Sequence, residues 1–305
     1  MRKRAKNQRV RERVTLGIQS IHQCDRTSAF DPPEKSLTMR FSNDIGRIST
    51  LLRAAPLQHV VTLKMLHLLG SSMRFHLLEG PSGWALMSLF SAGAFEYDRQ
   101  TYPDRELVVL IDGTSAAAKL EIIGKLPNTR IVVKTSDNAA GALLRASRSA
   151  RVIRTFLSFT SPENLAQQSK AAGISEGSNL KPEIALMLAQ NGYLDSELSR
   201  HFADGARWFA IQRNGRTCSA GFVFRNFESV WEIGGIYTEP EFRRQGFGRM
   251  IVAAALSELL GTGRIPRYQV RSDNEPSINL ATASGLVEFL RMDHLLVDPI
   301  GPPHS

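Results

Sequence analysis

The chain has 305 residues, of which 42% are hydrophobic and 22% are charged. At roughly 150 residues per domain this length corresponds to about two domains, and the composition excludes collagen-like, coiled-coil and wholly disordered chains. The two cysteines, Cys24 and Cys218, make neither a metal-ligand spacing nor a disulfide framework, so we expect no metal site and a cytoplasmic protein. No apolar run reaches the roughly 18 residues that cross a membrane, so we expect no membrane contact.

The net charge of +9 is concentrated at the N-terminus. Residues 1–13 contain seven basic side chains and one acid, and therefore carry six of the nine net charges. The rest of the chain is nearly neutral, which argues against a broad surface for nucleic acid. We predict a basic, disordered tail over residues 1–42. Non-specific binding of nucleic acid by this arm is the less favoured alternative.

Hydrophobic periodicity predicts a first α/β half over residues 43–155. Apolar residues at three- and four-residue spacing indicate a helix from Asn43 that Pro56 interrupts, and a second helix that ends at Gly70. A Gly-Pro-Ser-Gly turn then joins two extended segments into a hairpin. The elements expected after the two helices are strands at 75–78, 84–89 and 107–111, a helix at 116–126, a strand at 131–134, a helix at 139–148 and a strand at 152–159.

The second half, over residues 160–298, repeats this order with clearer signals. After a polar stretch and a helix at 183–190, Asn214-Gly215 marks a tight hairpin between two strands. The further elements expected are strands at 208–212, 218–224 and 230–238, a helix at 250–260, a strand at 268–271, a helix at 275–283 and a strand at 287–297. The shared order hairpin, strand, helix, strand, helix, strand predicts an α/β (α+β mixed sheet) protein of two related halves.

The segment that carries chemistry is the turn before the helix at 250–260. Gly246 and Gly248 remove side chains where the chain enters this helix, and unpaired N–H groups at a helix start attract anions. Arg243, Arg244 and Arg249 add positive charge, so a pyrophosphate is the expected ligand. The Rossmann pattern does not fit, because it needs a small third residue and a parallel unit. The Walker A pattern does not fit either, because the segment has no Gly-Lys-Ser/Thr. The alternative is a glycine-rich helix start with solvated arginines.

Two motifs in order give the region from Glu232 to Gly285 its resemblance to a known family. Arg243-x-x-Gly246-x-Gly248 and the later Asn274-x-x-Ser277-x-x-Leu280 resemble the two sequence patterns of the GNAT superfamily of acetyl-CoA-dependent N-acetyltransferases. The resemblance implies a GNAT-like fold in the C-terminal half. The doubled layout resembles two-lobed members such as glycine N-acyltransferase-like enzymes, which implies that the N-terminal half is a degenerate, related lobe.

The resemblance also implies a binding site for acetyl-CoA, used as the acyl donor. The strand end should run beside the pantetheine arm, the loop and helix start should hold the pyrophosphate, and the next helix should contact the cofactor. The residues implied are Ile236, Tyr237 and Thr238 for the arm, Arg243, Arg244, Gly246, Phe247, Gly248 and Arg249 for the pyrophosphate, and Asn274 and Ser277 on the next helix. Asn274 is equally well read as a plain helix cap.

Direct attack of a neutral amine on the thioester is the reaction that the resemblance implies. It needs a base for the amine proton, and Glu232 stands 14 residues before Gly246, where some family members carry theirs. Strand alternation predicts that Glu232 shares a face with Gly234 and Ile236; the alternative is a surface carboxylate. The family's usual tyrosine, the acid for the thiolate, is replaced by Ala281.

We therefore expect an N-acyltransferase that moves an acetyl group to a primary amine on a small molecule or peptide. The alternative is an acetyl-CoA-binding regulatory module with weak or no turnover, which the alanine at position 281 favours. The sequence leaves the acceptor and the oligomeric state open. His294 is a further candidate for proton transfer, although a lone histidine on a strand is more often structural.

Overall fold

The computed structural model describes residues 38–40, 44–163 and 173–301. Most of the predicted tail, including the basic segment 1–13 and Cys24, lies outside this part of the chain. Three residues assigned to the tail, Thr38–Arg40, instead form strand β1, which pairs antiparallel with β2. Residues 37–305 form one compact unit, so the two halves described below belong to a single body. The division into ranges 43–155 and 160–298 stays a prediction.

The first half follows the predicted order closely. Asp44 caps α1, because its side chain accepts from Arg47 N, and Gly70, with φ +48°, ends α2. The short helix α3 was missed. The elements are α1 (Ile45–Arg53), α2 (Val60–Leu69), β2 (Arg74–Gly80), β3 (Gly83–Ser91), α3 (Glu96–Thr101), β4 (Leu107–Gly113), α4 (Ala116–Ile123), β5 (Ile131–Thr135), α5 (Asn138–Ser147) and β6 (Ala150–Thr160), with 3-10 turns η1 (Gly70–Ser72) and η2 (Ala92–Ala94).

The second half repeats the order hairpin, strand, helix, strand, helix, strand, as predicted. The hairpin turn at Asn214-Gly215 has positive φ at both residues, as a two-residue I′ turn requires. Strand β7 and helix α7 were missed, since they fall in polar stretches. The elements are β7 (Ile174–Gly177), α6 (Pro182–Ala189), α7 (Asp195–Ala203), β8 (Arg207–Arg213), β9 (Arg216–Phe227), β10 (Val230–Thr238), η3 (Pro240–Phe242), α8 (Phe247–Gly261), β11 (Ile265–Arg271), α9 (Glu275–Ala283) and β12 (Val287–Val297).

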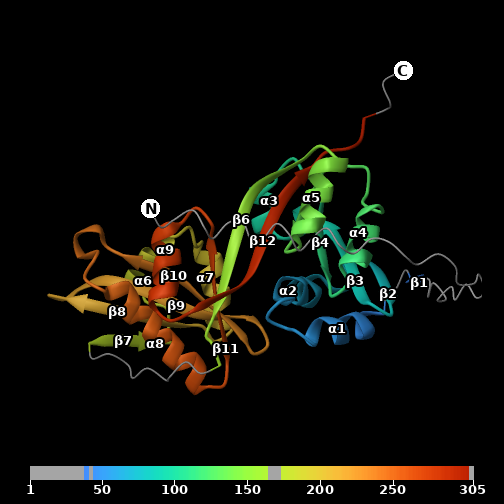
Figure 1. The fold of residues 1–305 in the computed structure, drawn as a ribbon. Helices are drawn as coiled ribbons and strands as arrows, with labels where there is room; N and C mark the ends of the chain where they lie inside the picture. The colour runs from blue at the N-terminus through green and yellow to red at the C-terminus, as the bar shows by residue number, and fades with distance from the viewer. Residues whose placement is uncertain (1–37, 41–43, 164–172, 302–305) are drawn as a thin grey trace, which may run out of the picture. The chain divides into compact units, whose positions relative to one another are not determined.

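The two halves exchange their last strands. Within the described ranges the strands form one 12-stranded sheet in the order β1-β2-β3-β4-β5-β12-β6-β11-β10-β9-β8-β7. Strand β12, from the end of the chain, pairs with β5 of the first half, and β6 pairs with β11 of the second half. The two exchanged strands also pair with each other, antiparallel, and run side by side in Figure 1. Each half therefore completes its sheet with a strand of the other.

Buried side chains on the exchanged strands anchor them in the opposite half. Leu295 and Val297 of β12 pack in one hydrophobic cluster with residues of β3, β4 and β5 and of the helices α4 and α5. Leu157 and Phe159 of β6 pack in another, beside helix α8 of the second half. Burying such side chains is worth about 1.5–3 kcal/mol each, so the exchange contributes substantially to stability.

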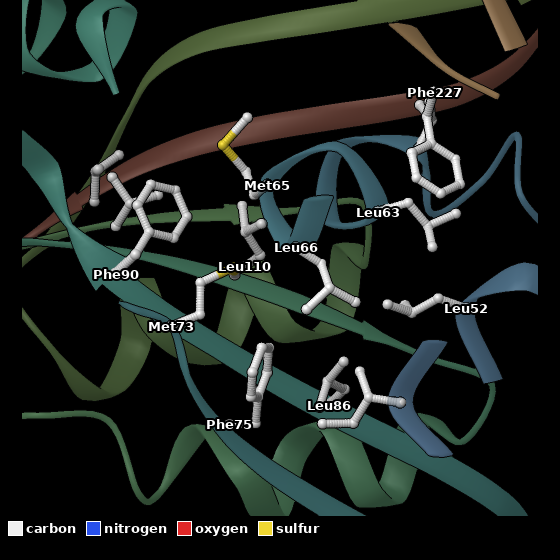
Figure 2. Close-up of a cluster of buried hydrophobic side chains, with 14 of the residues drawn as sticks. Leu52, Leu63, Met65, Leu66, Met73, Phe75, Leu86, Phe90, Leu110 and Phe227 are labelled. Carbon is white, nitrogen blue, oxygen red and sulfur yellow. The ribbon is translucent and has the colours of Figure 1, made fainter. Parts of the chain in front are cut away.

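Helices cover both faces of the sheet. In the first half α1 and α2 cover one face, and α4 and α5 cover the other. In the second half α6 and α7 pack on one face and α8 on the opposite one. Helix α2 also reaches the second half, because Phe227 of β9 joins the cluster around Leu63 and Met65 (Figure 2). No helix in the described residues is long and apolar enough to cross a membrane.

The strand exchange predicts that a cavity made on β12 weakens both halves together. Leu295→Ala removes a fully buried side chain and should lower the free energy of unfolding by about 2–5 kcal/mol. In a Trp84→Phe background the remaining tryptophans, Trp208 and Trp231, report on the second half alone. Their fluorescence transition in denaturant should shift together with the loss of circular dichroism. If the midpoint of the fluorescence transition stays unchanged while the midpoint of the circular dichroism transition falls, the two halves are not coupled and the prediction is wrong.

Candidate functional site

A fork between β10 and β11 is the central feature of the second half. The two strands are parallel neighbours, but only Val230, Trp231 and Glu232 of β10 pair with β11. In the part of the chain that the structure describes, no strand pairs with this edge of β10 beyond Glu232. The edge is therefore open over the segment Ile233–Thr238, where backbone groups can bond to an extended ligand.

A bulge in β10 lies at the mouth of the fork. Its register against β9 shifts between Gly234 and Tyr237, and Gly235 has φ +63°, a conformation that side chains disfavour. Because of this bulge, the prediction that Glu232, Gly234 and Ile236 share one face of the strand is wrong for Ile236. Glu232 and Gly234 share a face as expected, but the extra residue turns Ile236 to the opposite face, where it packs with the α8 cluster.

Glu232 holds the strands apart. It is buried, not a surface carboxylate, and its side chain accepts three hydrogen bonds. Oε1 accepts from the backbone N–H of Gln269 at 2.8 Å, a group that would otherwise be free to bond to a neighbouring strand. Oε2 accepts from Asn226 Nδ2 at 2.9 Å and from Arg267 Nη1 at 2.6 Å. The carboxylate thus takes the place of β-ladder bonds where the two strands separate.

The start of helix α8 lies at the end of β10, as the sequence predicts. Gly246 caps the helix in the left-handed conformation, with φ +81°, and no side chain caps it. The first helical bond runs from Met250 N to Gly246 O, so the N–H groups of residues 247–249 have no carbonyl within the helix. Arg243, Arg244 and Arg249 surround them and are exposed. This arrangement is suited to a phosphate group.

A cavity of about 520 Å³ opens from the fork. It extends from Gly234, Gly235 and Ile236 across β11 to residues of the first half on α2 and β5. The exchanged strands supply Phe156, Met292 and His294 to its lining. The volume is in the range of small-molecule sites. The cavity is therefore built by both halves.

The corresponding strands of the first half do not separate. Strands β4 and β5 are also parallel neighbours, but they pair without interruption from Leu107 and Ile131 to Ile111 and Thr135. Helix α4, which follows β4, is capped by the side chain of Ser115, which accepts from Ala118 N. In the described residues, the position of the first half that corresponds to the fork thus has neither an open strand edge nor an uncapped helix start.

The structure places the predicted site residues in two groups. Glu232, Ile236, Asn274 and Ser277 line the cavity, and the loop with Arg243, Arg244, Gly246 and Arg249 surrounds the start of α8. Phe247 is buried in the core, so it can offer only its backbone N–H. Asn274 also acts as the cap of α9, because its Oδ1 accepts from Ser277 N at 3.2 Å.

The remaining predicted residues lie at the junction of strand and loop. Tyr237 and Thr238 end β10, and Arg243 Nε donates to Thr238 O at 3.0 Å. The Arg243 guanidinium also lies 5.8 Å from the centre of the Tyr237 ring. Ala281 is fully buried on α9, one turn beyond Ser277, so no hydroxyl enters the cavity from its position.

Several cavity residues were not predicted. Tyr193, on the loop before α7, has its hydroxyl 2.6 Å from the point where a Cβ on Gly234 would lie. Burial, with Glu232 and Glu197 nearby, raises the pKa of Tyr193, so its hydroxyl keeps its proton at neutral pH. Lys64, on helix α2 of the first half, also lines the cavity. The sequence feature that could have indicated Lys64 is that it is the single lysine in the mostly apolar helix Val60–Leu69.

His294 lies in the cavity lining as an uncharged ring. It is buried, and its Nδ1 lies 2.5 Å from the hydroxyl of Tyr102. Burial and the nearby cations of Lys134 and Arg154 lower the pKa of His294 well below its ordinary value, which keeps it neutral at pH 7. Cys218 is a fully buried strand residue whose Sγ donates to Ile211 O, outside the cavity lining.

Comparison with known proteins agrees with this geometry. Residues 182–286 match the acetyltransferase (GNAT) family model. This segment is a GNAT-family acetyltransferase domain. The match includes the forked strands, the start of α8 and the capped helix α9. No curated protein sequence matched the chain.

Solved structures share the fold of the whole described chain. A GCN5-related N-acetyltransferase from Sphaerobacter thermophilus has a TM-score of 0.56 at 13% identity, over 87% of this chain and 97% of that one. A Drosophila protein gives 0.54 at 13% identity, over 87% and 99%. A GNAT-family acetyltransferase from Colwellia psychrerythraea gives 0.52 at 11%, over 86% and 100%. At such identities the likeness shows the fold alone, and it extends over both halves.

The helix start predicts a charge-sensitive site for acetyl-CoA. A carboxylate at Gly248 would occupy the anion position, so Gly248→Glu should weaken binding by about 100-fold or more. The fold should persist, because a Cβ there meets Leu280 Cδ2 only at 3.4 Å and an acid suits a helix N-terminus. Calorimetry with acetyl-CoA measures the effect, with Gly93→Glu in an exposed turn as control. Equal affinity of Gly248→Glu and the wild type would remove the site assignment.

Proposed function

We propose that the protein is an acyl-CoA-dependent N-acyltransferase that moves the acetyl group of acetyl-CoA to a primary amine. The observation that carries this proposal is the open edge of β10 at the fork, which runs from the anion-suited start of α8 to the cavity between the two halves. Such an arrangement suits a long thioester donor whose phosphate end and reactive end lie at opposite ends of one strand. The acceptor is a small amine, because the cavity volume is about 520 Å³.

The chain's residues have separate tasks in this proposal. The N–H groups of residues 247–249, with Arg243, Arg244 and Arg249, hold the pyrophosphate. Backbone groups of residues 236–238 hold the pantetheine arm as an added strand. Asn274 and Ser277 contact the donor from α9. A backbone N–H near Ile236 stabilises the oxyanion that forms when the amine attacks the thioester carbonyl.

Glu232 takes the proton from the attacking nitrogen in this proposal. The amine nitrogen bonds to the carbonyl carbon, the carbon–sulfur bond breaks, and the products are an amide and a thiolate. Glu232 lines the cavity at the fork, beside the segment where the thioester would lie. Its three hydrogen bonds fix the carboxylate in place.

Tyr193 supplies the proton for the departing thiolate. Its hydroxyl lies over Gly234, and in the described residues it makes no hydrogen bond. The hydroxyl is protonated at neutral pH and so has a proton to donate, although burial raises its pKa and makes it a weaker acid than an exposed tyrosine. Tyr193 thus takes the task left open at Ala281. This removes the main argument for the alternative, an inactive acetyl-CoA-binding regulatory module.

Glu232→Gln tests the base. The variant should lower kcat by about 10²–10⁴-fold at neutral pH, the usual worth of general acid–base catalysis. The loss should shrink at high pH, where the amine is already neutral. Loss of the buried pair with Arg267 should also lower the melting temperature, so rates are compared well below it. Glu288→Gln, exposed on β12, is the matched control.

A purely structural role for Glu232 gives a different pattern. Because Glu232 also holds the fork, acetyl-CoA affinity can fall in either case; if the carboxylate has only this structural role, the loss of kcat is the same at every pH. That pattern would contradict its assignment as the base.

Tyr193→Phe tests the acid. The ring keeps its packing against Phe222, so acetyl-CoA affinity should be unchanged. We expect kcat to fall by about 10- to 100-fold, at the low end for acid catalysis, because a thiolate is a fair leaving group. Steady-state thiol release and calorimetry separate the two quantities. A wild-type kcat would show that solvent protonates the thiolate.

A further inference from the structure

The charged groups that line the cavity have partners, with one exception among the described residues. In each pair the charge of one side chain lies beside a partner of its own. The pairs are Arg267 with Glu232 at 2.6 Å, Lys134 with Asp98 at 2.6 Å, Glu197 with His201 at 3.7 Å, and Arg271 with Asp273. The exception is Lys64, whose ammonium group makes neither an ion pair nor a hydrogen bond within the described ranges.

Lys64 lies on the wall of the cavity opposite the fork, on helix α2 of the first half. Its side chain is half-buried, and its Nζ lies 5.8 Å from the centre of the Phe95 ring. Burial lowers the pKa of Lys64, and the field of Glu232 opposes this shift. A cation kept from water in this way is stabilised by an anion that neutralises it.

In the described residues neither carboxylate that lines the cavity forms an ion pair or a hydrogen bond with Lys64. Both oxygens of Glu232 already accept hydrogen bonds, from Gln269 on one and from Asn226 and Arg267 on the other. Glu197 lies 3.7 Å from His201 Nε2 on its own helix, and it acts on Lys64 only through its field, without a direct bond in the described residues. The positive charge of Lys64 is therefore left for a ligand.

We propose that Lys64 binds an anionic group, a carboxylate or a phosphate, that the acceptor amine carries. This inference rests on the proposed function and names the class of acceptor. The anionic group would lie against α2 and the amine would point to the fork, so that one molecule spans the cavity between the two halves. An ammonium–anion contact of this kind also orients the nitrogen for attack.

Matched pairs of amines test this proposal with the full-length protein and acetyl-CoA. The pairs are phenylalanine with 2-phenylethylamine, β-alanine with ethylamine, and O-phosphoethanolamine with ethanolamine. In at least one pair the anionic member should have a kcat/KM about 10- to 100-fold higher, mainly through KM, as expected for a charged hydrogen bond. The pair that shows the preference tells a carboxylate from a phosphate.

Substitutions of Lys64 identify the residue responsible. Lys64→Met keeps the length and helix propensity of the side chain and should abolish the preference, leaving the rate with neutral amines unchanged. Lys64→Arg should retain most of it, because the charge remains. Loss of kcat in both variants with neutral amines would instead identify Lys64 as a base and overturn the proposal. Lys125→Met, at an exposed position beyond α4, is the control.

A binding measurement separates this proposal from the proposed function. Calorimetry of the CoA-bound protein with the same amines needs no turnover. Binding of an anionic amine that Lys64→Met abolishes, without acetylation of any amine, would leave the anion site intact and refute the proposed function. Equal acetylation of both members of every pair, unchanged in Lys64→Met, would overturn the anion site and leave the proposed function standing.

Discussion

The Glu232 carboxylate at the point where β10 and β11 separate is the interaction on which the site depends. By accepting the Gln269 N–H and pairing with Arg267, it replaces backbone bonds that would otherwise continue the parallel ladder. The energetic cost of burying an ion pair is offset here by two further hydrogen bonds, to the Gln269 and Asn226 donors. Without this side chain, the strands have no evident reason to part at this residue, and the uninterrupted pairing of β4 with β5 shows the alternative in the same molecule.

The exchange of strands explains why both halves contribute to one cavity. Because β6 and β12 cross between the halves and pair with each other, residues far apart in the sequence become neighbours in the sheet. Asp293, for example, is opposite both Thr135 and Thr155, which lie 158 and 138 positions before it. Lys64 reaches the cavity because α2 also packs against Phe227 of the second half. The first half thus has the same order of elements as the second half while it supplies one wall of the cavity. In our proposal this division assigns the start of α8 to the donor and α2 to the acceptor.

The local order of elements was predictable because it depends on short-range signals. Turn residues such as Asn214-Gly215 and the periodicity of α1 and α9 determine their elements almost alone. The glycines at 246 and 248 likewise predicted the uncapped start of α8. The strand exchange was not predictable, since β6 and β12 have the same apolar character and only long-range packing decides their partners. The bulge at Gly235 moved Ile236 to the other face for the same reason: alternation holds only while the register does.

Hydrogen exchange with and without acetyl-CoA tests most directly the claim that the fork in the second half holds the donor. An added strand of pantetheine would bond to open N–H groups on β10, and the phosphates would cover those at the start of α8. We predict slower exchange over residues 233–238 and 246–250 and no change over residues 107–118, the corresponding segment of the first half. Protection of residues 107–118, or protection of neither segment while acetyl-CoA binds, would contradict the account.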